Sequence, residues 1–249
     1  RVLGWSYQAS DWLYSSYIRY GWAQGYFHGT LNRKTGIVTA TDTAYYGSAA
    51  GQKPVQIYNA YESLDEPGEW YYDQMSGRLY IYPFADTTRN STLRMTSSNF
   101  DLISVNGASY LNLEGLTVTS SKKDGIVMNN VDHCVIENCN ATYSGLKNSE
   151  VAYTSISAIY LNGGDYQTME PGYDFITNCR IHDTNQYRTM NEGGVKFRGV
   201  KNTFSNNEVY NITDMALNFA IVGGGPTSLD CVIENNSFHD VVLNGKDMG

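Results

Sequence analysis

The chain has 249 residues and a net charge of −8, from 17 Lys and Arg against 25 Asp and Glu. This charge disfavours a nucleic-acid backbone or an anionic membrane surface as the partner. No apolar run approaches the ~20 residues that a membrane-spanning helix needs, so we also expect no membrane span.

Residues 1 to about 100 predict a small β domain. Residues 36–40 and 55–59 resemble short strands. Residues 69–73 and 78–82 predict a hairpin, because Gly77 can adopt the positive φ that such a turn favours. Trp70, Tyr72, Leu79 and Ile81 can then share one face. We expect this domain to pack on the rest of the chain.

From residue 101 to 242 the chain repeats one pattern of apolar and small polar residues. Five segments share it: 111–118, 134–141, 174–181, 203–209 and 231–238. A second set of short apolar runs lies at 124–128, 157–161, 193–197 and 215–219. These runs alternate as a strand buried on one side does, and no segment of helical length separates them.

Strands of about five residues, repeated every roughly 22 to 40 residues with Asn, Gly and Ser between them, fit a parallel β-solenoid better than a sandwich. Equivalent residues of successive coils then stack at ~4.8 Å. We therefore predict an all-β chain with a small β domain at 1–100 and solenoid coils at 101–249. We expect the chain to be a fragment whose coils continue beyond residue 249.

One inward column of the predicted solenoid combines thiols and amides. It reads Leu116, Cys139, Cys179, Asn207, Asn236, and the next reads Val118, Ala141, Ile181, Val209, Phe238. Asn207 and Asn236 predict a ladder, because stacked amides can bond to one another and to backbone groups. Cys139 and Cys179 are either stacked thiols or a disulfide between coils.

Two segments carry a resemblance to a known family. Residues 59–73 (NAYESLDEPGEWYYD) and 76–83 (SGRLYIYP) resemble the region before the coils in a group of right-handed parallel β-helix proteins. The group includes the β-xylosidases and the fucosidase/xylanase-type glycoside hydrolases with this fold. The resemblance covers about residues 55–249 and implies a right-handed parallel β-helix. In that group an Asp-x-Gly segment follows the last His-Asp-Val at the active cleft, which implies a catalytic carboxylate at Asp247.

Aligning the second set of strands places three carboxylates, Glu192, Asp214 and Asp247, at one corner of successive coils. Carboxyl groups one coil apart approach the ~5 to 5.5 Å of a retaining glycosidase, and two coils apart the ~6.5 to 9.5 Å of an inverting one. Like charges so close raise one pKa, which separates a general acid from a base or nucleophile. Two alternatives stay open: Glu192 and Asp214 as solvated turn caps, and a Ca²⁺ site built from the same oxygens.

Lys196 and Arg198 alternate with apolar residues and should point outward, with Asn218 stacked on Lys196. They can orient sugar hydroxyls or a uronate carboxylate, or be surface charges paired with Glu192. Asp165 and Arg188 lie on the longer excursions from the coils, where solenoids often build a binding groove. His182 and His239 share a column with Tyr210, which favours a structural turn over catalysis.

These patterns predict a secreted or cell-surface glycoside hydrolase that acts on an oligo- or polysaccharide without a cofactor, Ca²⁺ being the one metal to consider. One alternative is a polysaccharide lyase that uses Lys196 or Arg198 as its base. The other is a non-catalytic glycan-binding or adhesin protein that uses the rigid coils as a scaffold.

Overall fold

The computed structural model describes residues 13–17, 24–41, 54–93, 95, 96, 98–144, 156–185, 193–219 and 228–243. The chain divides into two compact units, with the main boundary between residues 93 and 94. Each unit is described by itself.

The first unit is built from short antiparallel strands. One sheet has the order β2 (Gln24–Phe27), β1 (Leu13–Tyr17), β5 (Gln56–Tyr58), and β3 (Gly29–Asn32) pairs with β4 (Ile37–Ala40). A 3-10 helix, η2, spans Tyr61–Ser63. Among its described residues, one core cluster consists of the buried Phe27, Leu31 and Ala60, against which Val38, Val55 and Ile57 pack.

The predicted hairpin is confirmed as β6 (Trp70–Asp73) and β7 (Arg78–Ile81). Trp70 pairs with Ile81 and Tyr72 with Leu79, so these four side chains share a face as expected. Gly77 has a φ of 67° in the turn. On the other face the rings of Tyr71 and Tyr80 stack, and Tyr61 meets both rings edge-on.

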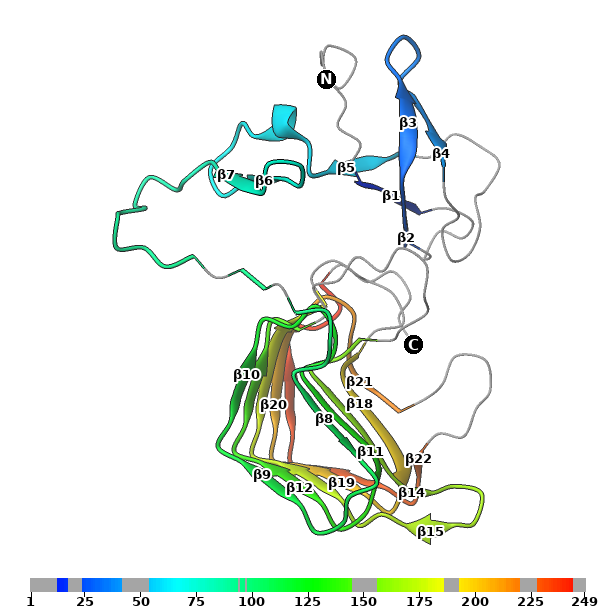
Figure 1. The fold of residues 1–249 in the computed structure, drawn as a ribbon. Coiled ribbons are helices and arrows are strands. Elements are labelled where there is room, and N and C mark those ends of the chain that lie inside the picture. Colours follow the sequence, from blue (N-terminus) through cyan, green and yellow to red (C-terminus); the bar gives the residue numbers. More distant parts are fainter. Residues whose placement is uncertain are drawn as a thin grey trace. The chain divides into compact units, whose positions relative to one another are not determined.

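The second unit is a parallel β-helix of three sheets (Figure 1). Sheet I contains β8 (Ile103–Asn106), β11 (Ile126–Val131), β14 (Ile159–Asp165), β18 (Gly193–Val200) and β21 (Met215–Asn218). Sheet II contains β9 (Asn112–Glu114), β12 (Val135–Glu137), β16 (Phe175–Thr177), β19 (Thr203–Ser205) and β23 (Val232–Glu234). Sheet III contains β10 (Thr117–Thr119), β13 (Asn140–Thr142), β17 (Arg180–Thr184), β20 (Glu208–Ile212) and β24 (Ser237–His239). Two further strands, β15 (Glu170–Pro171) and β22 (Ser228–Leu229), flank sheet I.

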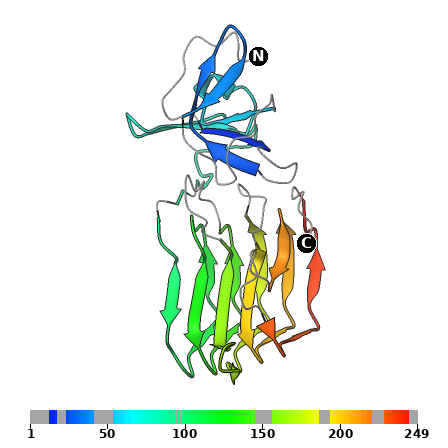
Figure 2. The same cartoon turned by 90° about the vertical axis from the view of Figure 1, so that its right-hand side faces the viewer.

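Each coil contributes one strand to every sheet, and the coils follow one another in chain order (Figure 2). The predicted register is confirmed in sheet I, where Ile126 pairs with Ile159, Ile159 with Val195, and Val195 with Leu217. It is also confirmed in sheet III, where the paired column is Val118, Ala141, Ile181, Val209 and Phe238. The prediction of an all-β solenoid is therefore correct.

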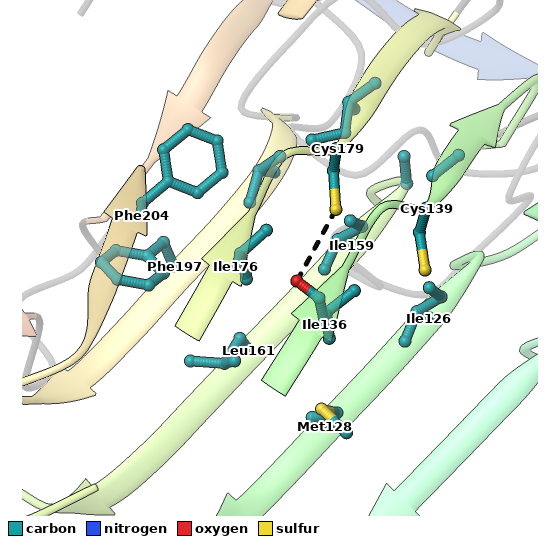
Figure 3. Close-up of a cluster of buried hydrophobic side chains, with 14 of the residues drawn as sticks. Ile126, Met128, Ile136, Cys139, Ile159, Leu161, Ile176, Cys179, Phe197 and Phe204 are labelled. Carbon is teal, nitrogen blue, oxygen red and sulfur yellow. Dashed lines mark hydrogen bonds between the residues drawn. The ribbon is translucent and has the colours of Figure 1, made fainter. Parts of the chain in front are cut away.

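The core runs through the middle of the coils as stacked columns of apolar side chains (Figure 3). Met128, Leu161 and Phe197 stack from sheet I, and Ile136, Ile176 and Phe204 face them from sheet II. All six are fully buried. Because each strand offers only a few inward residues, a coil buries its apolar surface mainly against its neighbours.

Left-handed backbone at the corners turns the chain from one sheet into the next. Between sheets II and III the corner residues are Gly115, Asn138, Asn178, Asn206 and Asn235, with φ between 54° and 66°. Asn and Gly accept this conformation at the lowest cost, which explains the recurring Asn in the repeat. The corner between sheets I and II uses larger residues in the same conformation: Tyr110, His133, Tyr173, Lys201 and Asp230.

The predicted amide ladder is confirmed just inside the second corner. Asn207 accepts a hydrogen bond from the Cys179 backbone N–H at 2.9 Å and donates to the Ile176 carbonyl at 3.0 Å. Asn236 accepts from the Asn207 backbone N–H at 2.9 Å and donates to the Phe204 carbonyl at 2.9 Å. Each amide thus satisfies buried backbone groups of the preceding coil.

Cys139 and Cys179 occupy the same column as free thiols, so the alternative of a disulfide between coils is wrong. The thiol of Cys179 donates to the Ile136 carbonyl at 3.7 Å (Figure 3), and that of Cys139 to the Leu113 carbonyl at 3.5 Å. A thiol therefore makes a weaker version of the same hydrogen bond that Asn207 makes one coil later.

We predict that Asn207→Ala lowers the free energy of unfolding by about 3 kcal/mol, because it leaves a buried N–H and a buried carbonyl without partners. Urea unfolding followed by circular dichroism measures the change. Asn112→Ala is the matched control, because Asn112 is exposed and its side chain donates to the side chain of Glu137 and not to a buried backbone group. An equal loss in both variants would contradict a special role for the ladder.

Candidate functional site

The outward surface of sheet I gathers polar side chains from three successive coils. Val195 and Phe197 are fully buried, so Lys196 and Arg198 lie on the opposite side of β18, as predicted. Lys196 is paired with Tyr160 in β14 and with Asn218 in β21, and Arg198 is paired with Asn162. We call these residues the polar face: Tyr160, Asn162, Lys196, Arg198 and Asn218.

Several contacts hold the polar face in place. The guanidinium carbon of Arg198 lies 5.5 Å from the centroid of the Tyr160 ring, within the range of a cation–π contact. The amide of Asn162 donates to Asn129 Oδ1 at 2.8 Å. Asn202 Nδ2 donates to the Arg198 carbonyl at 2.9 Å and so fixes the backbone at the end of β18. The ring and the guanidinium therefore form a preorganised surface.

Lys196 is not the surface charge that one interpretation of the sequence expected. Its side chain is only 2% exposed, and Asn218 beside it is 7% exposed. An ammonium withdrawn from water needs nearby negative charge and hydrogen-bond acceptors. One acid on which the charge of Lys196 acts is Asp124, which directly precedes Gly125 and the start of β11 at Ile126.

Asp124 is the acid of the described residues whose surroundings best suit proton transfer. Its Oδ1 accepts hydrogen bonds from the backbone N–H of Ser157 at 2.5 Å and from the Ser157 hydroxyl at 2.7 Å. Burial raises the pKa of Asp124, an effect that the charge of Lys196 and the Ser157 hydrogen bonds oppose, and the nearby Asp101 adds to the rise. The side chain is half-buried, so solvent still reaches it.

Asp214 lies at the corner that leads into β21, where the register predicts it. Gly193 pairs with Met215, the residue that follows Asp214, as the predicted register requires. The expectation of a solvated turn cap is wrong for Asp214, because its side chain is fully buried. Asp124 precedes β11, and three coil steps of ~4.8 Å, or roughly 14 Å, separate it from the coil of β21 and Asp214. These two acids are therefore too far apart to act as a glycosidase pair.

The other predicted site residues lie away from this group or outside the described residues. Asp165 ends β14, where its Oδ1 accepts hydrogen bonds from the backbone N–H groups of Gln167 and Thr168 at 2.7 and 3.3 Å. It therefore caps the turn between β14 and β15. Glu192, Asp247 and Arg188 lie outside the described residues, and their predicted roles stay predictions.

The two recurring histidines form part of an aromatic stack on sheet III. The ring of Tyr210 lies 4.7 Å from that of His182 and 5.1 Å from that of His239, with interplanar angles of 6° and 4°. His182 also bonds to Asp183 at 2.6 Å and to Asn140 at 3.0 Å. The rings cover one another's faces, which agrees with the structural interpretation of these histidines.

Within the ranges that the structure describes, no group of three or more His, Cys, Asp or Glu side chains is arranged to hold a metal ion. A Ca²⁺ site at the predicted carboxylate corner stays a prediction, because two of its three acids lie outside those ranges. The same ranges contain no helix of the length and hydropathy that a membrane crossing requires.

Sequence reasoning missed Asp124, Ser157 and Tyr160. Asp124 is the first residue of one of the aligned runs. In that alignment it lies one position after the column of Glu192 and Asp214, so the column did not include it. A comparison of neighbouring coils gives the signal, because Asp124 is opposite Ser157, a hydroxyl that can donate to it. Tyr160 is directly opposite Lys196 in the same alignment.

We predict that Lys196→Met raises the pKa of Asp124 further, because it removes the positive charge that favours the ionised carboxylate. Carboxyl carbon chemical shifts followed through a pH titration give this pKa. Lys201→Met is the matched control, since Lys201 is on an exposed corner and lies 3.8 Å from Asp230. An unchanged pKa in Lys196→Met would show that the two groups are not coupled.

Comparison with known proteins gives one match. A family model described as "Right handed beta helix region" matches residues 101–247, which is more than half of the chain. Neither the curated proteins nor the solved structures provide a match. The matched residues include all three sheets of the second unit, and the parallel register of those sheets agrees with the family's fold. The chain therefore belongs to the right-handed β-helix family.

Proposed function

We propose that this protein is carbohydrate-active and that the polar face of sheet I, together with Asp124, hydrolyses glycosidic bonds. The observation that carries the proposal is Asp124, an acid with a raised pKa that Ser157 holds in place and that is electrostatically coupled to Lys196 of the polar face. A fold alone does not give a function. The proposal therefore depends on the chemistry of these side chains.

The polar face has features that suit a sugar. The Tyr160 ring offers an apolar surface, and the Arg198 guanidinium beside it offers several N–H donors for hydroxyl groups. Extended sheets of parallel strands also provide a long surface along which successive sugar units can lie. The buried Lys196 acts on Asp124 in this proposal and does not contact the substrate directly.

Asp124 in its protonated form donates its proton to the leaving glycosidic oxygen, as the acid of a glycosidase pair does. The second carboxylate is proposed to be Glu192, with Asp214 and Asp247 in the same predicted column. The pairing of Gly193 with Met215 supports this column, because Glu192 and Asp214 directly precede that pair in the sequence. A glycan-degrading protein meets its substrate outside the cell, so we also propose a secreted or surface location.

We predict that Asp124→Asn lowers turnover of natural oligosaccharides by about 100-fold or more, because an amide cannot protonate the leaving group. Aryl glycosides with a good leaving group need little protonation, so their cleavage should fall much less. The variant should also lose the fall in activity that the wild type shows as the pH rises through the pKa of Asp124. Rates on xylo- and fuco-oligosaccharides and on the corresponding aryl glycosides test this.

Asp230→Asn is the matched control for charge, because Asp230 is exposed on a corner of the coil. If Asp124→Asn lowers turnover of oligosaccharides and aryl glycosides equally, or lowers neither, Asp124 is not the general acid. Binding of oligosaccharides without any turnover would favour the non-catalytic alternative.

A lyase is the second candidate, because two cations, Lys196 and Arg198, lie on the same face. A lyase needs a base and positive charge near the carboxylate of an acidic sugar. Lysine can act as a base once burial disfavours its charged form. If this candidate is correct, we predict that acidic glycans yield products with the ultraviolet absorbance of an unsaturated uronate, and that Lys196→Met abolishes it. Hydrolytic products from the same glycans would exclude the lyase.

A further inference from the structure

The inward corner between sheets I and II contains a buried acid in a column of hydrogen-bond donors. Backbone hydrogen bonds between successive coils stack these positions in the order Leu111, Cys134, Asp174, Asn202 and Cys231. Asp174 is fully buried. Asp174 is not one of the proposed catalytic groups.

Three members of this column donate a hydrogen bond to a carbonyl of the preceding coil. The Cys134 thiol donates to the Ala108 carbonyl at 3.5 Å, and the Cys231 thiol to the Gly199 carbonyl at 3.6 Å. Asn202 Nδ2 donates to the Gly163 carbonyl at 2.9 Å. These acceptors are themselves stacked, so the equivalent acceptor for Asp174 is the carbonyl of Val131, which pairs with Gly163.

The carboxyl of Asp174 has one oxygen satisfied and one without a donor. Oδ1 accepts from the Cys134 backbone N–H at 2.8 Å, whereas Oδ2 has no hydrogen-bond partner among the described residues. A Cβ built on Gly163 would lie 1.6 Å from Oδ2 and 3.1 Å from the Val131 carbonyl oxygen, so both oxygens border the same small space. A Cβ on Gly172 would lie 2.5 Å from both Oδ2 and Asn202 Oδ1. Glycine at both positions leaves room for the carboxyl.

The neighbours of Oδ2 are therefore acceptor oxygens, which repel a carboxylate but accept a proton from a carboxylic acid. We propose that Asp174 is a proton-dependent latch: the folded coil holds its carboxyl neutral, and loss of that proton weakens the contact between the coils at this corner. In the neutral form Asp174 makes the same kind of hydrogen bond as Cys134, Asn202 and Cys231.

The electrostatic surroundings agree with this assignment. Burial raises the pKa of Asp174 to about 6, and the negative charge of Asp132 adds to the rise. The hydrogen bond from the Cys134 N–H and the charge of His133 act in the opposite direction. Asp132 Oδ2 and His133 Nδ1 are 3.1 Å apart, so the opposing effects of these two groups on the pKa of Asp174 partly cancel. The thiol of Cys134 is neutral, because burial raises its pKa.

The direction of the pH dependence follows from the shift. The carboxyl ionises at 3.8 in an ordinary environment and at about 6 in the fold, so between these values the unfolded chain is ionised and the folded chain is protonated. Stability from this group is therefore complete below pH 3.8 and is lost as the pH rises through about 6. Each pH unit in this window multiplies the unfolding constant by ~10, which amounts to roughly 100-fold in total.

Asp174→Asn tests the latch, because an amide supplies a permanent donor in place of the proton. Urea unfolding of the full chain is measured from pH 4.5 to 7.5 for the wild type and the variant. We expect the unfolding constant of the wild type, divided by that of the variant, to rise with pH and then level off. The variant should be the more stable protein at pH 7.5. Comparing the two proteins cancels the contributions of other titrating groups, including Asp124.

Asp165→Asn is the matched control, since it removes an exposed carboxylate from the end of β14 and an amide oxygen can still cap the turn. The unfolding constant of Asp165→Asn should vary with pH as that of the wild type does. The proposal is overturned if the unfolding constant of Asp174→Asn also varies with pH as that of the wild type does. If that variant does not fold, the carboxyl carbon shift of Asp174 in the wild type decides: an ionised group at pH 5 would refute the latch.

Discussion

Hydrogen-bonded stacking of equivalent residues, one coil above another, is the interaction on which the rest of this β-helix depends. Each strand is short and offers only a few side chains to the interior, so no coil has a core of its own. The core exists because Met128, Leu161 and Phe197 meet in one column and Ile136, Ile176 and Phe204 in another. Any group that disturbs the register at one coil also disturbs its two neighbours.

At the corners, stacked side chains must also satisfy backbone hydrogen-bonding groups inside the coil. The chain must turn sharply between sheets, and the left-handed corner residues leave backbone carbonyls and N–H groups inside the coil. Asn207 and Asn236 satisfy them fully, the thiols of Cys139 and Cys179 satisfy them more weakly, and Asp174 does so only in its protonated form. At each of the two corners, chemically different side chains therefore donate the same kind of hydrogen bond to a carbonyl of the preceding coil.

The same stacking places the candidate site. A strand buried on one side presents every second residue outward, so Tyr160, Lys196 and Asn218 form one outward column. The column brings a ring, an ammonium and an amide from distant parts of the sequence onto one surface. Asp124 lies two coils from Lys196, and the charge of Lys196 opposes the rise in the pKa of Asp124.

The sequence alone determined the coils and their register, because a repeat of apolar pairs and Asn is visible wherever the inward positions recur. It also determined the β6–β7 hairpin, the amide ladder and the outward side of Lys196 and Arg198, all of which follow from local alternation and turn residues. Only the tertiary structure decided that Lys196 and Asp214 are buried, that Cys139 and Cys179 are free thiols, and that Asp124 pairs with Ser157. Burial depends on which segments cover a residue from outside its own strand, and the period of a repeat carries no information about it. The register places Asp124 opposite Ser157, but only the structure shows that the hydrogen bonds between them form.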